Sequence, residues 1–159
     1  MMSDPKTFRL YSLVMLPVAI AVIWFAFRHG YRPEPVPIPV PRGNIDVSVG
    51  GRVFSAEIAD TPKIRELGLG ERDSLCTDCS MLFHFDVPGR YSFWMKGMRF
   101  PLDFAWISEG RIIRIDRNVP KDSVDILTPP EPVTDVLETN AGSLSGSEVG
   151  DSVIFTGVK

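Results

Sequence analysis

Apolar and polar side chains alternate over several short stretches after residue 43, which is the pattern of half-buried β-strands. Residues 45–49 alternate in this way, and residues 53–58 continue in an extended pattern. Between them, Gly50 and Gly51 can form a tight turn. Two alternating segments joined by so short a glycine turn predict a β-hairpin at the start of the domain.

The same pattern predicts more strands and one helix further along the chain. The strands are expected over residues 81–85, 91–96, 104–107, 111–116, 133–138 and 152–155. Thr61 followed by Pro62 is typical of a helix start, and Gly68 would end that helix. Residues 118–132 are rich in proline and predict a long surface loop. We expect a mainly β domain (a β-rich α+β fold), in which a compact barrel-like sheet carries one or two short helices.

An uncharged apolar segment precedes this domain. Residues 10–27 are 18 positions without a charge, flanked by Arg9 and Arg28. At ~1.5 Å per residue such a helix is ~27 Å long, close to the hydrocarbon thickness of a bilayer. A cleaved signal peptide would need small residues at its end, and a buried core helix would show a polar face. The segment therefore predicts a single transmembrane signal anchor over residues 10–28, after a short tail of residues 1–9.

Residues 29–43 between the anchor and the domain form a proline-rich linker. Proline occupies every second position from residue 33 to 41. This spacing removes backbone donors and favours an extended polyproline II rod that rises ~3.1 Å per residue. The linker is therefore predicted to be a spacer that holds a globular domain, residues 44–159, away from the membrane. Basic residues stand on both sides of the anchor, so the orientation rests on the spacer, which favours an extracytoplasmic domain.

The composition limits the partners of the chain. It is 44% hydrophobic with a formal net charge of −3, which excludes a wholly disordered chain. Residues 42–159 carry 13 basic and 18 acidic side chains, a net charge of −5. A general nucleic-acid binder needs a dense positive surface. We therefore expect no nucleic-acid partner. The expected partners are the lipid bilayer, through residues 10–28, and a ligand or protein of the cell envelope.

The two cysteines, Cys76 and Cys79, have a C-x-x-C spacing. This spacing fits a local disulfide, a redox dithiol or half of a zinc site. The domain offers one histidine, His84, so a four-ligand zinc site is short of ligands. Together with nearby methionines, these three residues leave a thiol- or copper-handling function as an alternative. We favour a local disulfide outside the cytoplasm, and expect no bound metal and no cofactor.

A polar group of side chains within the apolar segments 92–103 predicts a binding site. In a strand, Trp94 and Lys96 share one face, and Asp103 returns after a proline turn. An indole beside an ammonium group suits flat polar ligands, including sugars and peptides. Lys96 equally fits a structural ion pair with Asp103 or Glu138. The candidate ligand-binding residues are Trp94, Lys96, Asp103 and Glu138, with Arg65 and Arg72 as supports.

An enzymatic alternative uses the two acidic residues of this set. Asp103 and Glu138 could act as the acid and base of a hydrolase of envelope polymers. The sequence contains no nucleophile motif that would support such an enzyme. We therefore assign no catalytic residues and favour a non-catalytic module that binds a ligand or partner.

Several short motifs resemble one known family. They are Gly68-Leu69 with Arg72, Met81-Leu82-Phe83, Phe93-Trp94-Met95-Lys96, Pro101-Leu102-Asp103, Gly110-Arg111-Ile112, Leu137-Glu138 and Gly150-Asp151. Over about residues 45–155 the chain resembles the domain of unknown function 192 family, whose members are often exported or membrane-tethered. The resemblance implies a β-rich fold with short helices. The family's activity is undefined, so the resemblance carries over no catalytic residues.

The chain departs from the family pattern at three places. The family usually has methionine where Gly70 stands, glycine where Ser80 stands, and Asn-Thr where Gly97-Met98 stand. If the family's Asn and Thr contact a ligand, this chain has altered that contact.

Overall fold

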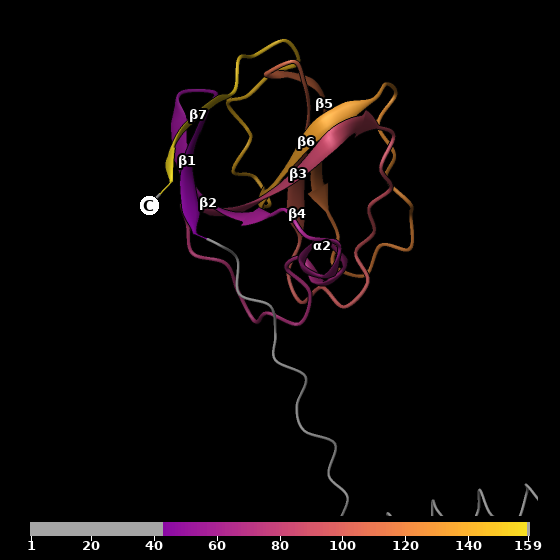
Figure 1. Ribbon diagram of the computed structural model, residues 1–159. Helices are drawn as coiled ribbons and strands as arrows, with labels where there is room; N and C mark the ends of the chain where they lie inside the picture. Colours follow the sequence, from indigo (N-terminus) through magenta and orange to yellow (C-terminus); the bar gives the residue numbers. More distant parts are fainter. Residues whose placement is uncertain (1–42, 159) are drawn as a thin grey trace, which may run out of the picture. The chain divides into compact units, whose positions relative to one another are not determined.

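The computed structural model describes residues 43–158, which form seven strands and one short helix (Figure 1). In chain order the elements are β1 (Asn44–Val49), β2 (Arg52–Ala59), α2 (Pro62–Leu67), β3 (Cys79–Gly89), β4 (Leu102–Ser108), β5 (Arg111–Val119), β6 (Val133–Asn140) and β7 (Ile154–Val158). All strands belong to one mixed sheet in the order β5-β4-β6-β3-β2-β1-β7. The prediction of a mainly β fold is confirmed.

The predicted N-terminal parts of the chain lie outside the described residues. These parts are the tail of residues 1–9, the anchor of residues 10–28 and nearly all of the linker over residues 29–43. Within the described part, no helix has the length and apolar character that crossing a bilayer requires. The membrane anchor therefore stays a prediction.

The predicted hairpin and helix both form for the expected reasons. β1 and β2 pair antiparallel around Gly50 and Gly51, whose φ angles of 56° and 78° fit a tight hairpin turn. The hydroxyl of Thr61 accepts the N–H of Ile64 at 3.3 Å and caps α2. Gly68 ends the helix with φ 53°. The helix lies in the crossover between β2 and β3, which run parallel.

The predicted strand over residues 91–96 is wrong. Among residues 43–158, its only ladder contact is an isolated bridge between Phe93 and Leu127. The strand before it in the chain, β3, already pairs with β2 on one side and β6 on the other. The segment therefore cannot form a hairpin with β3, and it packs against the face of the sheet instead, where Phe93 contacts Phe83 and Phe104.

The sheet is open rather than a closed barrel, because its two edge strands, β5 and β7, do not pair with each other. The last strand begins at Ile154, two residues later than predicted. The segment before it reaches β5 instead: Val153 donates to the Gly110 carbonyl at 2.8 Å, and Ile112 donates to the Asp151 carbonyl at 3.0 Å. The prediction of a barrel-like sheet is corrected accordingly, and one helix forms in the described part.

The sheet is curved (Figure 1). A hydrophobic core lies on each of its faces. The first core includes Val47, Phe54, Leu82, Ala105, Ile107, Leu137 and Leu144. The second core includes Ile64, Leu69, Met81, Phe83, Met95, Phe104, Trp106 and Val136. Consecutive residues of β4, such as Ala105 and Trp106, contribute to opposite cores because side chains alternate along a strand. Helix α2 and the segment over residues 91–98 cover the second core, and they form the candidate site.

Candidate functional site

A cleft of about 270 Å³ lies between α2 with its following turn and the segment over residues 91–98. Its lining residues are Pro62, Arg65, Glu66, Leu67, Leu69, Gly70, Phe83, Phe85, Tyr91, Ser92, Phe93, Trp94, Lys96 and Met98. Pockets that enclose a whole drug-sized ligand have volumes of roughly 300–1,000 Å³. The cleft is therefore sized for one part of a longer ligand.

Aromatic packing fixes the floor of the cleft. The Phe93 ring meets Phe83 edge-on at 4.8 Å between centroids and meets Trp106 at 5.4 Å. Phe85 and Tyr91 stack with centroids 3.6 Å apart, and the Tyr91 hydroxyl donates to the Val87 carbonyl at 2.6 Å. These contacts hold the rings in place before any ligand binds.

Two cations stand at this aromatic floor. The Arg65 guanidinium lies 4.9 Å from the centre of the Phe85 ring and donates to the His84 carbonyl at 2.7 Å. Lys96 is exposed and forms no ion pair within residues 43–158. Trp94 is 55% exposed, which is unusual for a large apolar side chain. The predicted residues Arg65, Trp94 and Lys96 therefore line a single cleft.

Asp103 does not belong to this cleft. Its side chain is fully buried, and its carboxylate accepts the backbone N–H groups of Asn118 at 2.7 Å and Leu144 at 3.0 Å. These bonds tie β4 to the end of β5 and to the loop after β6. The structure therefore gives Asp103 a structural role, and it forms no ion pair with Lys96.

Glu138 and Arg72 also lie away from the cleft lining. Glu57, Met81 and Glu138 occupy one row across β2, β3 and β6. Arg72 binds both carboxylate oxygens of Glu57, at 2.6 and 2.8 Å, and this hydrogen bonding raises the pKa of Arg72. Burial raises the pKa of Glu138 to about 8, while the charge of Arg72 opposes that rise. At neutral pH Glu138 is therefore largely protonated.

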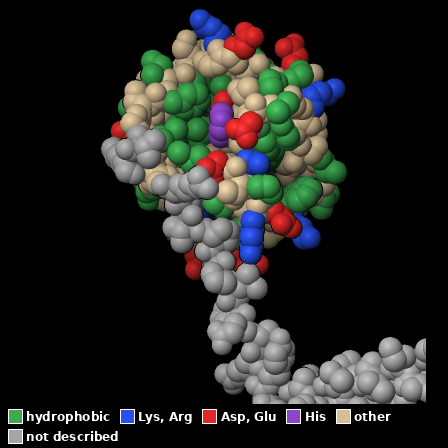
Figure 2. Space-filling view, in the orientation of Figure 1, with side chains coloured by type: hydrophobic (Ala, Val, Ile, Leu, Met, Phe, Trp, Pro, Cys, Tyr) green, Lys and Arg blue, Asp and Glu red, His purple; other side chains and the backbone are tan. Residues whose placement is uncertain are grey.

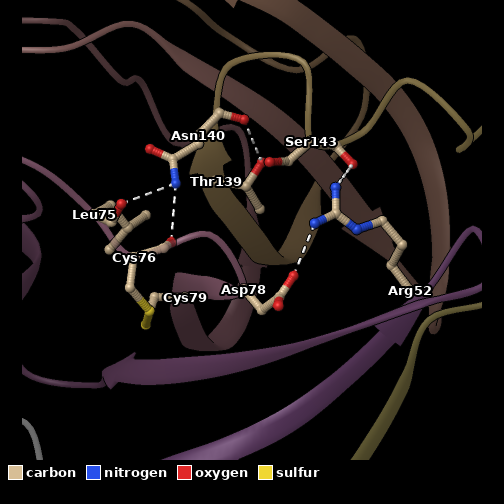
Figure 3. Close-up of polar contacts among 8 residues, drawn as sticks. All are labelled: Arg52, Leu75, Cys76, Asp78, Cys79, Thr139, Asn140 and Ser143. Atoms are coloured by element: carbon tan, nitrogen blue, oxygen red, sulfur yellow. Dashed lines mark hydrogen bonds and ion pairs between the residues drawn. A yellow bond between two sulfur atoms is a disulfide. The ribbon is translucent and has the colours of Figure 1, made fainter.

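The cysteines form a disulfide across the small loop that leads into β3, whose first residue is Cys79 (Figure 3). The side-chain amide of Asn140 donates to the carbonyls of Leu75 and Cys76, at 3.1 and 2.9 Å. On the far side of the loop, Arg52 binds Asp78 at 2.8 Å. Two strands, β6 and β2, thus hold the disulfide loop at the end of the sheet.

The structure does not gather the residues of the thiol- or copper-handling alternative. His84 lies five residues after Cys79 on β3, which is about 17 Å along an extended strand. Its Nδ1 bonds Asp135 at 2.8 Å, and its ring is exposed. On the face of the molecule that Figure 2 shows, acidic and basic side chains gather around a histidine. Over residues 43–158, no group of three or more His, Cys, Asp or Glu side chains is arranged to hold a metal ion.

Much of the cleft lining was not among the predicted site residues. The helix contributes Pro62, Glu66 and Leu67, and the aromatic pair Phe85 and Tyr91 forms part of the floor. The two aromatics flank the turn at Pro88-Gly89, so their pairing across a turn was a usable signal. The contribution of the helix depends on how α2 packs, which no local pattern specifies.

A protein-family model and two solved structures are similar to this chain. The model for DUF192, described as Uncharacterized ACR, matches residues 45–155. A crystal structure named as a "putative transcription regulator" from Sinorhizobium meliloti 1021 is 32% identical, with a TM-score of 0.68. The alignment covers 76% of this chain and 98% of that chain.

The second similar structure is a protein of unknown function from Novosphingobium aromaticivorans DSM 12444. It is 31% identical with a TM-score of 0.64, and the alignment covers 70% of this chain and 83% of that chain. No curated protein matches this chain significantly.

Proposed function

The chain belongs to the DUF192 family, and we propose that it is a non-catalytic module whose cleft binds part of an extended ligand. The observation that carries this proposal is an exposed Trp94 that lines one cleft together with two cations, Arg65 and Lys96, and a fixed aromatic floor. An indole left more than half exposed gives up the free energy of burial unless a partner covers it. The ligand therefore has an apolar or flat group for the floor and a negative charge for the cations.

Two departures from the usual family residues support a ligand particular to this chain. Gly70 and Met98 replace residues that the family usually has, and both line the cleft. A Cβ at Gly70 would lie 2.9 Å from the Leu67 carbonyl oxygen, so a larger residue there requires a different backbone. The cleft shape, and with it the preferred ligand, should differ between this chain and members with the usual residues.

The proposal places this module outside the cytoplasm, tethered to the membrane through residues 10–28. The uncharged segment, the proline-rich linker and the oxidised pair Cys76–Cys79 support this location, because disulfides persist in oxidising compartments. Protease added to intact and to lysed cells tests it. If the domain is extracytoplasmic, protease should cleave it in cells whose outer barrier is opened and whose inner membrane is still intact. If the domain resists protease until the inner membrane is lysed, the proposed location is refuted.

Binding of the aromatic anion 1-anilinonaphthalene-8-sulfonate to the full-length chain in detergent micelles tests the cleft. The neutral N-phenyl-1-naphthylamine is the matched uncharged probe. We expect saturable binding of the anion that weakens about tenfold in Lys96→Ala and in Trp94→Ala, since each variant removes one charge or one aromatic contact. The neutral probe should respond to Trp94→Ala alone.

Lys121→Ala is the matched control variant, because Lys121 is an exposed cation outside the cleft lining. Its affinity for the anion should equal that of the wild type. Wild-type affinity in both Lys96→Ala and Trp94→Ala, with the fold intact by circular dichroism, would place the ligand elsewhere and overturn the proposal.

A further inference from the structure

We propose that the ligand is a polypeptide segment, which the cleft binds as an added β-strand along the backbone edge of residues 92–94. This inference rests on the proposed function and names the chemical class of its ligand. It uses a feature that the side chains alone do not reveal: one edge of this segment has unpaired backbone groups.

The segment is paired on one edge only. Phe93 donates to the Leu127 carbonyl at 2.9 Å, and Leu127 donates to the Phe93 carbonyl at 2.8 Å. In an extended chain the N–H and C=O groups of Ser92 and Trp94 point to the opposite edge. Within residues 43–158 these groups form no hydrogen bond, and both residues are exposed.

The lining of the cleft indicates that the unpaired edge faces the cleft. Four consecutive residues, Tyr91 to Trp94, line it. Successive side chains of an extended segment point to opposite faces, so consecutive residues border one cavity when the backbone edge is turned toward it. The opposite wall is α2 with its following turn, and the space between them is the cleft itself.

The arrangement of unpaired groups matches a peptide better than a sugar polymer. Ser92 and Trp94 each offer one donor and one acceptor, and two residues of extended chain separate them by about 7 Å. This is the repeat at which a second strand presents its own backbone donors and acceptors. A glycan presents hydroxyl groups without that repeat.

The charges around the edge indicate the side chains of the peptide. Arg65 and Lys96 line the cleft together with one acidic residue, Glu66. Arg65 uses one of its five N–H donors on the His84 carbonyl, so others stay available to a carboxylate. The bound strand should therefore carry an acidic side chain beside an apolar one, which packs on Trp94.

The test begins with a display library of random linear peptides, selected on the full-length chain in detergent micelles. We expect selected peptides that are enriched in Asp or Glu next to an apolar residue and depleted of proline. The best peptide is then compared with its copy N-methylated at every backbone position, which keeps every side chain and removes the backbone donors of both edges. The methylated copy should bind roughly tenfold more weakly or worse.

A matched pair of variants examines the protein's own backbone. Ser92→Pro removes both the backbone N–H of residue 92 and the Ser92 hydroxyl, which contacts Thr128 at 3.2 Å. Ser92→Ala removes the hydroxyl and keeps the N–H. We expect Ser92→Ala to bind the peptide and Ser92→Pro not to bind it. Hydrogen exchange on the wild type gives a second readout: the amides of Ser92 and Trp94 should become protected on binding, while Phe93 is protected throughout.

Three results would overturn the inference: selection that yields no binding peptide, equal binding of the methylated copy, or unchanged exchange at Ser92 and Trp94. The naphthalene-sulfonate experiment distinguishes failure of this inference from failure of the proposed function. If binding of that probe still depends on Lys96 and Trp94, the cleft remains the ligand site and only the added strand is refuted. If it does not, the proposed function itself falls.

Discussion

Asp103 and Glu138 lie on neighbouring strands, one register step apart, and project from opposite faces of the sheet. Asp103 pairs with Thr139, and Glu138 pairs with Phe104, so the two acids are out of phase in the alternation of side chains. Asp103 accepts two backbone N–H groups on one face, while Glu138 faces Arg72 on the other. This geometry does not provide the acid–base pair of a hydrolase, because both carboxyls would have to reach one substrate bond.

The buried position of Asp103 predicts a structural phenotype for Asp103→Asn. The amide keeps the shape, but one of the two N–H groups, from Asn118 or Leu144, would then face an NH₂ donor. We expect the free energy of unfolding to fall by about 1–3 kcal/mol in denaturant titration. Asp122→Asn, at an exposed position, should stay within about 0.5 kcal/mol of the wild type. Equal stability of the two variants would contradict the role given to Asp103.

The raised pKa of Glu138 predicts that this residue lowers the free energy of unfolding as the pH rises. Its pKa is about 8 in the fold, against its ordinary value of 4.5. Below pH 4.5 the carboxyl is protonated in both states, whereas between 4.5 and about 8 only the unfolded chain ionises it. Within this window the contribution of Glu138 to the free energy of unfolding falls by about 1 kcal/mol for each pH unit, and above the window this loss stops growing.

The measurement compares denaturant unfolding of the wild type and Glu138→Gln at a series of pH values. Glu138→Gln cannot ionise, so its stability relative to the wild type should increase from pH 5 to pH 8. Glu131→Gln, at an exposed position, should follow the wild type at every pH. A constant difference between Glu138→Gln and the wild type would show that the carboxyl is ionised in the fold.

Local patterns predicted the elements whose determinants are local. The hairpin over β1 and β2 depends on Gly50 and Gly51, which adopt the positive φ angles of its turn. The ends of α2 depend on Thr61 and Gly68, which cap it as expected. The strand predicted over residues 91–96 failed, because alternation reports that a segment is extended and not whether a neighbouring strand is available to pair with it.

The candidate site was predictable only in part. Trp94 and Lys96 were expected on one face of a strand, and both line the cleft. The strand does not form, residues 96–97 make a turn, and the consecutive residues 91–94 all line the cleft, so alternation does not explain this placement. Asp103 and Glu138 were expected beside them, but their placement depends on the register between β4 and β6. Register is a long-range property that hydrophobic patterning leaves open when both faces of a strand are buried.

The contacts of Asn140 with the disulfide loop predict that the Cys76–Cys79 disulfide is reduced faster in Asn140→Ala than in the wild type. The Asn140 amide holds the carbonyls of Leu75 and Cys76 (Figure 3), so its loss favours opening of the loop by about 1 kcal/mol, or about fivefold in population. Stopped reactions with dithiothreitol, followed by counting of free thiols, measure the rate. Thr77→Ala, an exposed substitution inside the loop, should be reduced at the wild-type rate. Equal rates for both variants would show that the amide does not restrain the loop.

The cap of α2 links stability to binding at the cleft. Thr61 accepts the N–H of Ile64, and a helix of six residues is too short to persist without such support. Thr61→Ala should therefore cost about 1 kcal/mol of unfolding free energy, while Thr61→Ser keeps a hydroxyl acceptor and most of the stability. Because Arg65 and Leu67 of this helix line the cleft, Thr61→Ala should also weaken binding of the naphthalene sulfonate, and Thr61→Ser should not. Loss of stability without loss of affinity would mean that the cleft keeps its shape when the first turn of α2 frays, and that the opposite wall, with Trp94 and Lys96, suffices to bind the probe.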